Sequence, residues 1–227
     1  AANPLAVAKK TAKIAQELGL TNLKIAAVFG DDVMSMLDFS TQTFLESGES
    51  LSVLGNKIIS ANAYMGVEGI LIALEEGADI ILTGRVADPS LFLAPLIHEF
   101  AWSMDDYPLL GKGTALGHLM ECAGQVCGGY FADGVKKQVP NLGNLGFPIA
   151  EINNDGLFHI TKLKDSGGMV TTATCKEQLL YEVHDPSAYL TPDVVADFSN
   201  ITLKEIEKGK VEVYGASGKA LTGKLKV

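Results

Sequence analysis

The sequence predicts an α/β protein. Residues 1–130 are expected to form a mostly parallel sheet with flanking helices, and residues 131–227 a more antiparallel α+β region with hairpins. In the first part, short apolar segments alternate with helical ones, as in parallel strands joined by crossover helices. In the second part, pairs of short alternating segments flank turn residues, which is typical of hairpins.

The first part begins with a helix that has clear start and stop signals. Asn3 can cap its N-terminus, Pro4 suits its first turn and Gly19 follows its end. Its apolar residues recur at helical spacing, so one face packs and the lysine face is solvated. Gly77 is expected to end a later helix. Strands buried on both faces are predicted at 25–29, 57–61 and 79–83, and further helices at 67–76, 90–100 and 113–127.

Turn residues organise the second part. Asn153-Asn154-Asp155-Gly156 separates segments 149–152 and 157–161 and predicts a hairpin. A helix is expected over 174–181 and a second hairpin over 202–206 and 210–214. Residues 128–147 contain much Gly, Pro and Asn and predict an irregular connection.

Composition excludes several classes of protein. The chain has 227 residues, with 18 Lys and Arg against 27 Asp and Glu, so its formal charge is 18 − 27 = −9. This charge, with no basic stripe, argues against nucleic-acid binding. No apolar run reaches the roughly 20 residues that span a bilayer, so no membrane segment is expected. Three cysteines without a CxxC pair favour a reducing, cytoplasmic compartment.

Polar residues follow each predicted strand, where open parallel sheets bind ligands. These residues are Asp31, Asp32, Asn62, Tyr64, Arg85 and Asp88, with Gly84 beside them. A guanidinium at a strand end can bind a carboxylate or phosphate through two parallel hydrogen bonds. The backbone N–H groups at the start of the helix from Ser90 would bind the same anion. The alternative for Arg85 is an internal salt bridge to Asp88 or Asp31. Asp31 and Asp32 fit a general base or a clamp for a hard cation, or a cap for the segment from Val33.

A second candidate group lies on the helix predicted at 113–127. His118, Glu121 and Cys122 are spaced i, i+3 and i+4, so all three can share one face. That spacing fits a zinc site or a histidine-activated thiolate, but the full signature of neither is present. The alternative is a buried cysteine that acts as a small apolar residue. We therefore predict His118 and Glu121 as acid–base candidates and no metal site.

Several stretches in order resemble the acyclic terpene utilisation (AtuA-like) family. Thr83-Gly84-Arg85-Val86-Ala87-Asp88-Pro89 lies in the longest of them, and the matching stretches are 60–64, 78–96, 117–122, 128–131, 146–151 and 176–186. The resemblance covers the chain's whole length. It marks as motif positions Asn62, Gly84, Arg85, Asp88, His118, Glu121 and Tyr130. Family members usually have a Gly-rich segment before Asn3-Pro4 and continue past Val227, so we expect a fragment of a longer domain.

The resemblance implies a cytoplasmic catabolic protein, found beside genes for carboxylating and degrading branched acyl-CoA compounds. We expect an enzyme of branched-chain or acyclic terpenoid acid breakdown, of hydratase, lyase or isomerase type, that binds a small anionic substrate or its acyl-CoA. Asn62, Tyr64, Gly84, Arg85, Asp88 and Tyr130 would bind the substrate, and Asp31, Asp32, His118 or Glu121 would move the proton. The alternative is a non-catalytic binding or assembly subunit of a carboxylase-linked complex. The residues define no cofactor, and a homo-oligomer is expected on general grounds.

Overall fold

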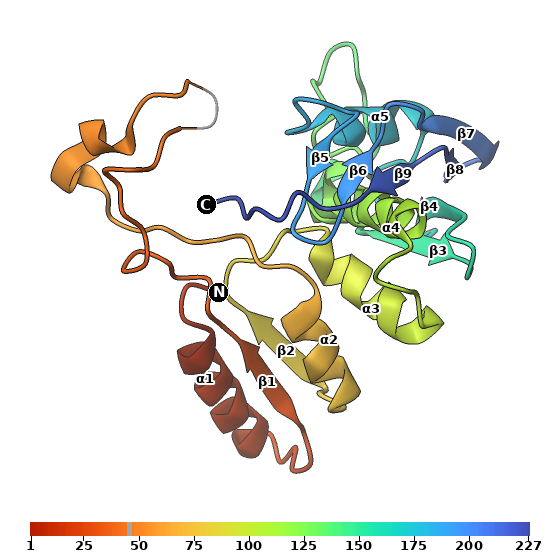
Figure 1. The fold of residues 1–227 in the computed structure, drawn as a ribbon. Coiled ribbons are helices and arrows are strands. Elements are labelled where there is room, and N and C mark those ends of the chain that lie inside the picture. The colour runs from red at the N-terminus through yellow and green to blue at the C-terminus, as the bar shows by residue number, and fades with distance from the viewer. Residues whose placement is uncertain (45–46) are drawn as a thin grey trace. The chain divides into compact units, whose positions relative to one another are not determined.

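The computed structural model describes residues 1–44 and 47–227 (Figure 1). The chain divides into two compact units. The first unit comprises residues 1–65, 72–86 and 225–227, and the second comprises 66–71 and 87–224. Each unit is described by itself below. The domain boundary predicted between residues 130 and 131 stays a prediction.

The first unit holds a two-stranded parallel sheet covered by one helix. β1 (Ile25–Val28) pairs with β2 (Ile80–Thr83) in register from Ile25 opposite Ile80 to Val28 opposite Thr83. Helix α1 (Pro4–Glu17) packs on both strands. Its start is as predicted, because Asn3 Oδ1 accepts a hydrogen bond from Ala6 N at 2.9 Å.

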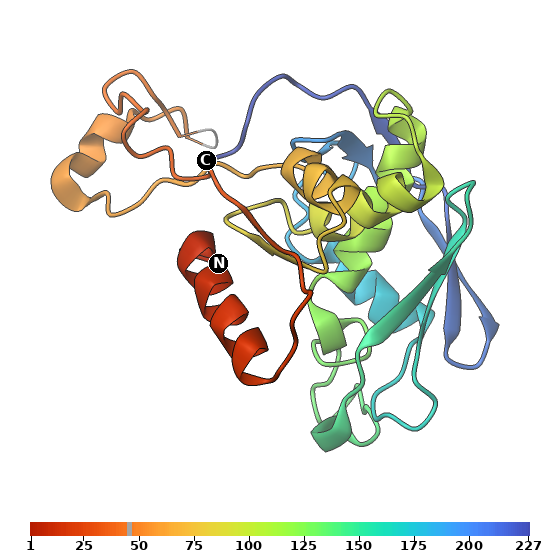
Figure 2. The same ribbon diagram turned by 90° about the horizontal axis from the view of Figure 1, so that it is seen from below.

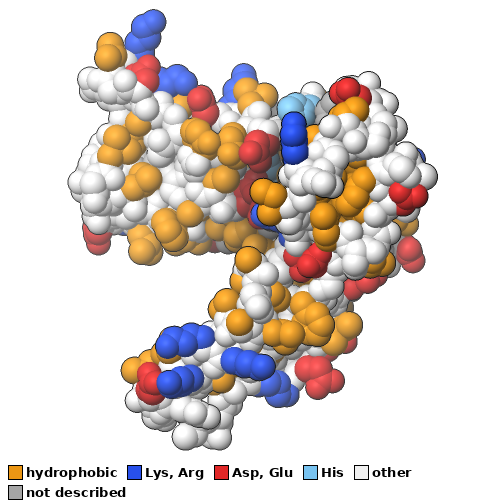
Figure 3. All heavy atoms as spheres, turned by 90° about the vertical axis from the view of Figure 1, so that its left-hand side faces the viewer, with side chains coloured by type: hydrophobic (Ala, Val, Ile, Leu, Met, Phe, Trp, Pro, Cys, Tyr) orange, Lys and Arg blue, Asp and Glu red, His pale blue; other side chains and the backbone are white. Residues whose placement is uncertain are grey.

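The exposed face of α1 carries three lysines, Lys9, Lys10 and Lys13. Figure 3 shows a group of Lys and Arg side chains in its lower part. Helix α2 (Glu68–Glu75) runs across the division between the units and ends before Gly77, whose φ of +71° is the left-handed conformation expected of a C-terminal stop.

The strand predicted at 57–61 is wrong. Residues Leu51–Lys57 form the 3₁₀-helix η1, and only an isolated bridge joins Asp32 to Asn62 beyond it. The mostly parallel sheet is therefore not confirmed, since the parallel sheet has only β1 and β2. With one covering helix, the side chains of both strands are half-buried and not buried on both faces as predicted.

The second unit contains two antiparallel sheets. One has the order β3-β4-β8-β7, built from β3 (Pro148–Ile152), β4 (Phe158–Lys162), β7 (Thr202–Glu207) and β8 (Lys210–Tyr214). The other joins β5 (Tyr189–Leu190), β6 (Val195–Asp197) and β9 (Ser217–Lys219). Both predicted hairpins are confirmed, whereas the short strands β5, β6 and β9 were not predicted.

The first hairpin shows why its turn could be predicted. Asn153 Oδ1 accepts hydrogen bonds from Asp155 N and Leu157 N, at 3.1 and 2.9 Å, and so closes the loop locally. Gly156 takes the left-handed φ of +74°. The Asn153 side chain and Gly156 together form the turn between β3 and β4.

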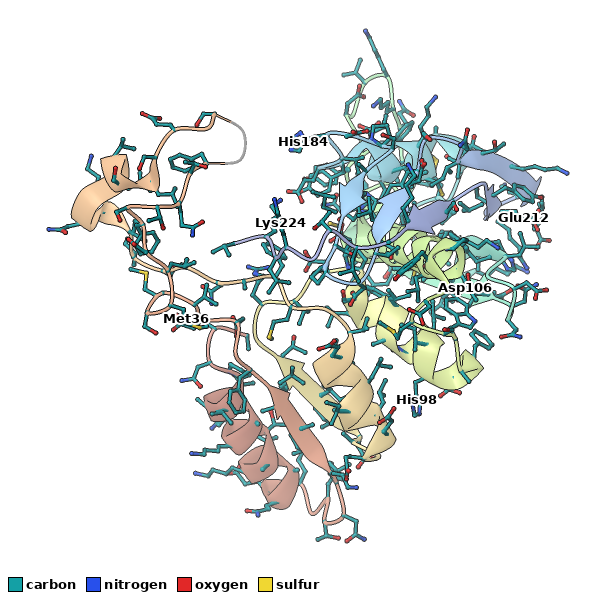
Figure 4. All side chains as sticks on the ribbon, viewed as in Figure 1. Met36, His98, Asp106, His184, Glu212 and Lys224 are labelled. Carbon is teal, nitrogen blue, oxygen red and sulfur yellow. The ribbon has the colours of Figure 1, made fainter. Side chains whose placement is uncertain are left out.

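Helix α4 (Tyr107–Met120) forms the core of the second unit and packs on α3 (Ser90–Phe100), α5 (Thr172–Leu180), β6 and β9 (Figure 2). It lies earlier than the predicted 113–127. Asp106 caps its start by accepting from Leu109 N at 3.1 Å (Asp106 is labelled in Figure 4). After Met120 the helix ends, and Ala123, with a φ of +50°, begins the 3₁₀-helix η2 (Ala123–Gln125).

The helices predicted at 90–100 and 174–181 are present as α3 and α5, with α5 shifted by one or two residues at its ends. Residues 128–147 are irregular except for the 3₁₀-helix η3 (Leu142–Asn144). The described cysteines are free thiols. Within the residues that the structure describes, no helix has both the length and the apolar character needed to cross a bilayer.

Candidate functional site

The strand ends of the first unit meet at the carboxylate of Asp31. Asp31 follows β1 and is only 8% exposed. Its Oδ2 accepts hydrogen bonds from Asn62 Nδ2 at 2.8 Å and from the backbone N of Arg85 at 2.9 Å. Burial alone would raise the pKa of Asp31, but these two hydrogen bonds lower it below its usual value. An ionised carboxylate therefore ties three distant segments of the chain together.

Gly84 is required here because of space. A β-carbon at residue 84 would stand 2.0 Å from Asp31 Oδ1, far inside contact distance. The missing side chain lets the carboxylate approach the backbone of residues 84 and 85. Gly84 therefore makes room for the Asp31 carboxylate at the strand ends.

Arg85 presents its guanidinium beside an aromatic ring. Its Cζ lies 5.3 Å from the centroid of the Tyr64 ring, and Lys226 Nζ lies 5.8 Å from the same centroid. The segment carrying Lys226 is attached at this point, since Tyr64 N donates to Lys226 O at 2.9 Å. Two exposed cations around one half-buried ring form a positive surface at the strand ends.

The predicted alternative of an Arg85–Asp31 salt bridge is not what the structure contains. Asp31 accepts from the backbone N–H of Arg85, not from its guanidinium. Among the described residues of the first unit, no carboxylate lies within ion-pair distance of that guanidinium. The Arg85 side chain is exposed. The other predicted partner, Asp88, belongs to the second unit, so that alternative stays a prediction.

Asp32 caps the segment that begins at Val33, which is one of the two alternatives predicted for it. Its Oδ1 accepts a hydrogen bond from Met34 N at 3.1 Å, so it closes the turn that follows β1. The side chain is exposed. Its backbone forms the bridge to Asn62, which brings the predicted residues Asp31, Asp32 and Asn62 into one group.

The other predicted residues, Asp88, His118, Glu121 and Tyr130, belong to the second unit. Because α4 ends at Met120, only His118 is helical, Glu121 is the C-terminal cap and Cys122 lies beyond. Burial is the first cause that raises the pKa of the Cys122 thiol, and the carboxylates of Glu121, Glu182 and Asp88 raise it further. The thiol therefore stays protonated, which disfavours the thiolate considered above.

His118 is fully buried in the last turn of α4. Its Nε2 lies 3.0 Å from Gln178 O, and its Nδ1 lies 3.0 Å from Glu121 Oε1. The second contact does not have the angle of a hydrogen bond, so we treat it as an electrostatic contact. No group of three His, Cys, Asp or Glu residues in the described parts of the chain is arranged to hold a metal ion.

Tyr130 is 44% exposed, and its ring lies 4.8 Å from that of Tyr181, centroid to centroid. Interaction with Tyr130 and then with Glu182 raises the pKa of Tyr181. Two phenols thus form one surface cluster near the end of α5, and the Tyr181 phenol stays protonated at neutral pH.

One hollow of the second unit is lined by no predicted site residue. It has a volume of about 490 Å³ and is lined by Trp102, Asp106, Lys112 and Asn154 among others. Its polar groups are already engaged, because Trp102 Nε1 donates to Asn154 O at 3.0 Å and Lys112 Nζ donates to Asp155 O at 2.9 Å. We assign it no role.

Sequence reasoning missed Asp193. This residue is 4% exposed, and it accepts hydrogen bonds from Val67 N at 2.8 Å and from Ser90 Oγ at 2.5 Å. Burial raises its pKa despite these hydrogen bonds. Its partners lie more than a hundred residues away at the starts of α2 and α3, so no local pattern identifies it. Gln178 and Lys226 were missed for the same reason.

The first unit therefore defines an α/β protein whose strand ends present two cations and one ionised, buried carboxylate, an arrangement suited to a small anionic ligand. The chain belongs to the acyclic terpene utilisation family, because the family model described as acyclic terpene utilisation family protein AtuA matches residues 1–227. This membership is consistent with a catabolic role. No curated protein and no solved structure matches the chain.

Proposed function

We propose that the chain acts as a cytoplasmic enzyme in the breakdown of acyclic terpenoid or branched-chain acids, on the free acid or its CoA thioester. One observation carries this proposal: Arg85 and Lys226 flank Tyr64 at the strand ends, where an anionic group can bind. A guanidinium forms paired, charge-assisted hydrogen bonds with a carboxylate or phosphate. Both the free acid and the CoA thioester carry such a group.

The proposed reaction is of hydratase, lyase or isomerase type, and each of these moves a proton. In the first unit the candidates are Asp31 and Asp32. Asp31 is held ionised, but its Oδ2 already accepts two hydrogen bonds, which favours a positioning role for Asn62 and Arg85. His118 and Glu121 are the candidates in the second unit.

Binding to the purified chain tests this function. Isothermal titration with geranic acid and with its CoA thioester is compared between wild type and Arg85→Ala. Loss of a charged two-pronged contact should weaken binding about tenfold or more, which corresponds to about 1.4 kcal/mol or more. The matched control is Lys13→Ala, which removes an exposed cation on α1 away from the strand ends.

Equal affinity of wild type and Arg85→Ala would contradict the assignment of Arg85, provided that circular dichroism shows the variant folded. Absence of binding to either compound by wild type would contradict the substrate class. Inorganic phosphate, titrated separately, shows whether the cations bind any small anion or require the acyl part.

Exposed apolar side chains favour a second candidate, a binding or assembly subunit of a carboxylase-linked complex. Met36, Val53 and Ile59 are 77%, 56% and 93% exposed in the long connection between β1 and α2 (Met36 is labelled in Figure 4). Exposed apolar side chains on one segment are typical of protein contacts. Sedimentation velocity of wild type and Ile59→Lys tests self-association first. A homo-oligomer that Ile59→Lys dissociates would support a role for this segment in assembly.

A further inference from the structure

Lys226 contributes a cation to the strand ends of the first unit, and no sequence pattern predicted it. Its carbonyl oxygen accepts a hydrogen bond from Tyr64 N at 2.9 Å, which attaches this part of the chain to the segment between η1 and α2. Its Nζ lies 5.8 Å from the centroid of the Tyr64 ring. The side chain is exposed, and among the described residues of the first unit no carboxylate lies within ion-pair distance of its ammonium group.

Arg85 lies beside the same ring, with its Cζ 5.3 Å from the centroid. The two cations differ in what they offer an anion. A guanidinium is planar and presents two parallel donors, which match the two oxygens of a carboxylate. An ammonium group is a compact point charge on a flexible stem. A single carboxylate therefore needs only the guanidinium.

A phosphate group can use both cations. It has three terminal oxygens in a tetrahedral arrangement and, as a monoester, a charge of about −1.5 to −2 at pH 7. Two of these oxygens can accept from a guanidinium, and the third can accept from an ammonium group beside it. The flexible stem of Lys226 lets its Nζ move toward that oxygen while the backbone stays bonded to Tyr64.

We propose that Lys226 selects a phosphate-bearing ligand at the strand ends of the first unit. This inference rests on the proposed function and deepens it by naming the bound form of the substrate. That form is the CoA thioester, because the free acid has no phosphate. Free phosphate has the same chemistry and is the other source of such a group. Lys226 thereby determines specificity, and the proton-transfer step does not involve it.

Isothermal titration of the whole chain with CoA, inorganic phosphate and geranic acid tests the role of Lys226. Lys226→Ala removes the ammonium group and keeps the carbonyl oxygen that accepts from Tyr64 N. It should weaken CoA binding about fivefold or more and leave geranic acid binding within about twofold of wild type. Inorganic phosphate should compete with CoA for wild type. Lys226→Arg should restore CoA binding, because a guanidinium also binds phosphate.

Lys224→Ala is the matched control, because it removes the same charge two residues earlier in the chain (Lys224 is labelled in Figure 4). It should bind CoA as wild type does. Unchanged CoA affinity in Lys226→Ala would overturn the proposal, and so would an equal loss for CoA and geranic acid. Binding of inorganic phosphate without binding of CoA would overturn the assignment of the CoA thioester and identify free phosphate as the source.

The proposed function is tested separately by these titrations. Geranic acid binding and its loss in Arg85→Ala concern the anion site itself, whereas the difference between CoA and geranic acid in Lys226→Ala concerns selection. Geranic acid binding that requires Arg85, together with CoA affinity that does not depend on Lys226, would support the function and overturn the inference. Absence of binding of all three ligands would overturn both.

Discussion

Asp31 lies against Gly84 so closely that a β-carbon at residue 84 would stand 2.0 Å from Asp31 Oδ1. The same carboxylate accepts the backbone N–H of Arg85, the residue after that glycine. The close approach therefore places the start of the Arg85 side chain directly beside a negative group that does not neutralise its guanidinium. A single buried aspartate organises the strand ends through the backbone of Arg85 and not through its guanidinium.

Gly84→Ala should destabilise the first unit. The added methyl group must displace either the Asp31 carboxylate or the backbone, and overpacking of this kind costs about 1–3 kcal/mol. Urea unfolding measures the loss. Gly143→Ala is the matched control, because a β-carbon there would meet no atom within 4 Å. Equal stability of Gly84→Ala and wild type would show that the carboxylate can move without cost.

Asp31→Asn should lower the stability of the protein at neutral pH. It should also make that stability depend less on pH in the acid range. The folded pKa of Asp31 lies below the model-compound value of 3.8, so its contribution is present above that value. It is lost as the pH falls through the folded pKa. Loss of charge-assisted hydrogen bonds at a buried group should cost about 1–3 kcal/mol at neutral pH.

Urea unfolding of both proteins across the acid range measures the Asp31 contribution as the difference between wild type and Asp31→Asn. That difference should shrink toward low pH. Other acids with lowered pKa values titrate equally in the two proteins and cancel. A difference that is independent of pH would mean that the charge of Asp31 contributes nothing.

The contribution of Asp193 to stability should depend on pH in the opposite direction from that of Asp31. Burial raises its folded pKa above the unfolded value, so its contribution is fully present below the unfolded pKa and is lost as the pH rises through the folded pKa. Asp193→Asn mimics the protonated side chain and keeps an acceptor for Val67 N. The stability of wild type relative to this variant should fall as the pH rises above about 4.

Asp193→Ala separates the charge from the hydrogen bonds. It leaves Val67 N without its acceptor and should cost about 1–3 kcal/mol relative to Asp193→Asn, because an unsatisfied buried donor bears its full desolvation cost. Thermal or urea unfolding of both variants provides the comparison. Similar stability of Asn and Ala at residue 193 would contradict the role of these hydrogen bonds.

Tyr64 should matter for anion binding through its ring and not through its hydroxyl. Tyr64→Phe keeps the aromatic face beside Arg85 and Lys226, whereas Tyr64→Leu removes it. A cation–π contact at an exposed site contributes about 0.5–1 kcal/mol, so Tyr64→Leu should weaken binding about two- to fivefold. Titration with geranic acid compares the three proteins. Equal loss in both variants would assign the effect to the hydroxyl group instead.

Features governed by neighbouring residues could be predicted from the chain alone. The cap at Asn3, the stop at Gly77 and the hairpin turn at 153–156 depend on hydrogen bonds and backbone angles within a few residues, and all are present. The hydrogen bonds of Asp31 join residues that each follow an apolar segment, although the segment before Asn62 is not a strand. Family membership required only the order of such segments.

Tertiary structure decided what depends on a distant partner. Residues 57–61 have the composition of a strand, but among the described residues no strand pairs with them, and the bridge that follows joins Asn62 to Asp32. Asp193 is defined by Val67 and Ser90, and the buried position of His118 by its hydrogen bonds with Gln178. A β-strand needs a neighbour for its backbone hydrogen bonds, and a buried polar group needs donors or acceptors from elsewhere in the chain. Local sequence contains neither, because the partners meet only when the chain has folded.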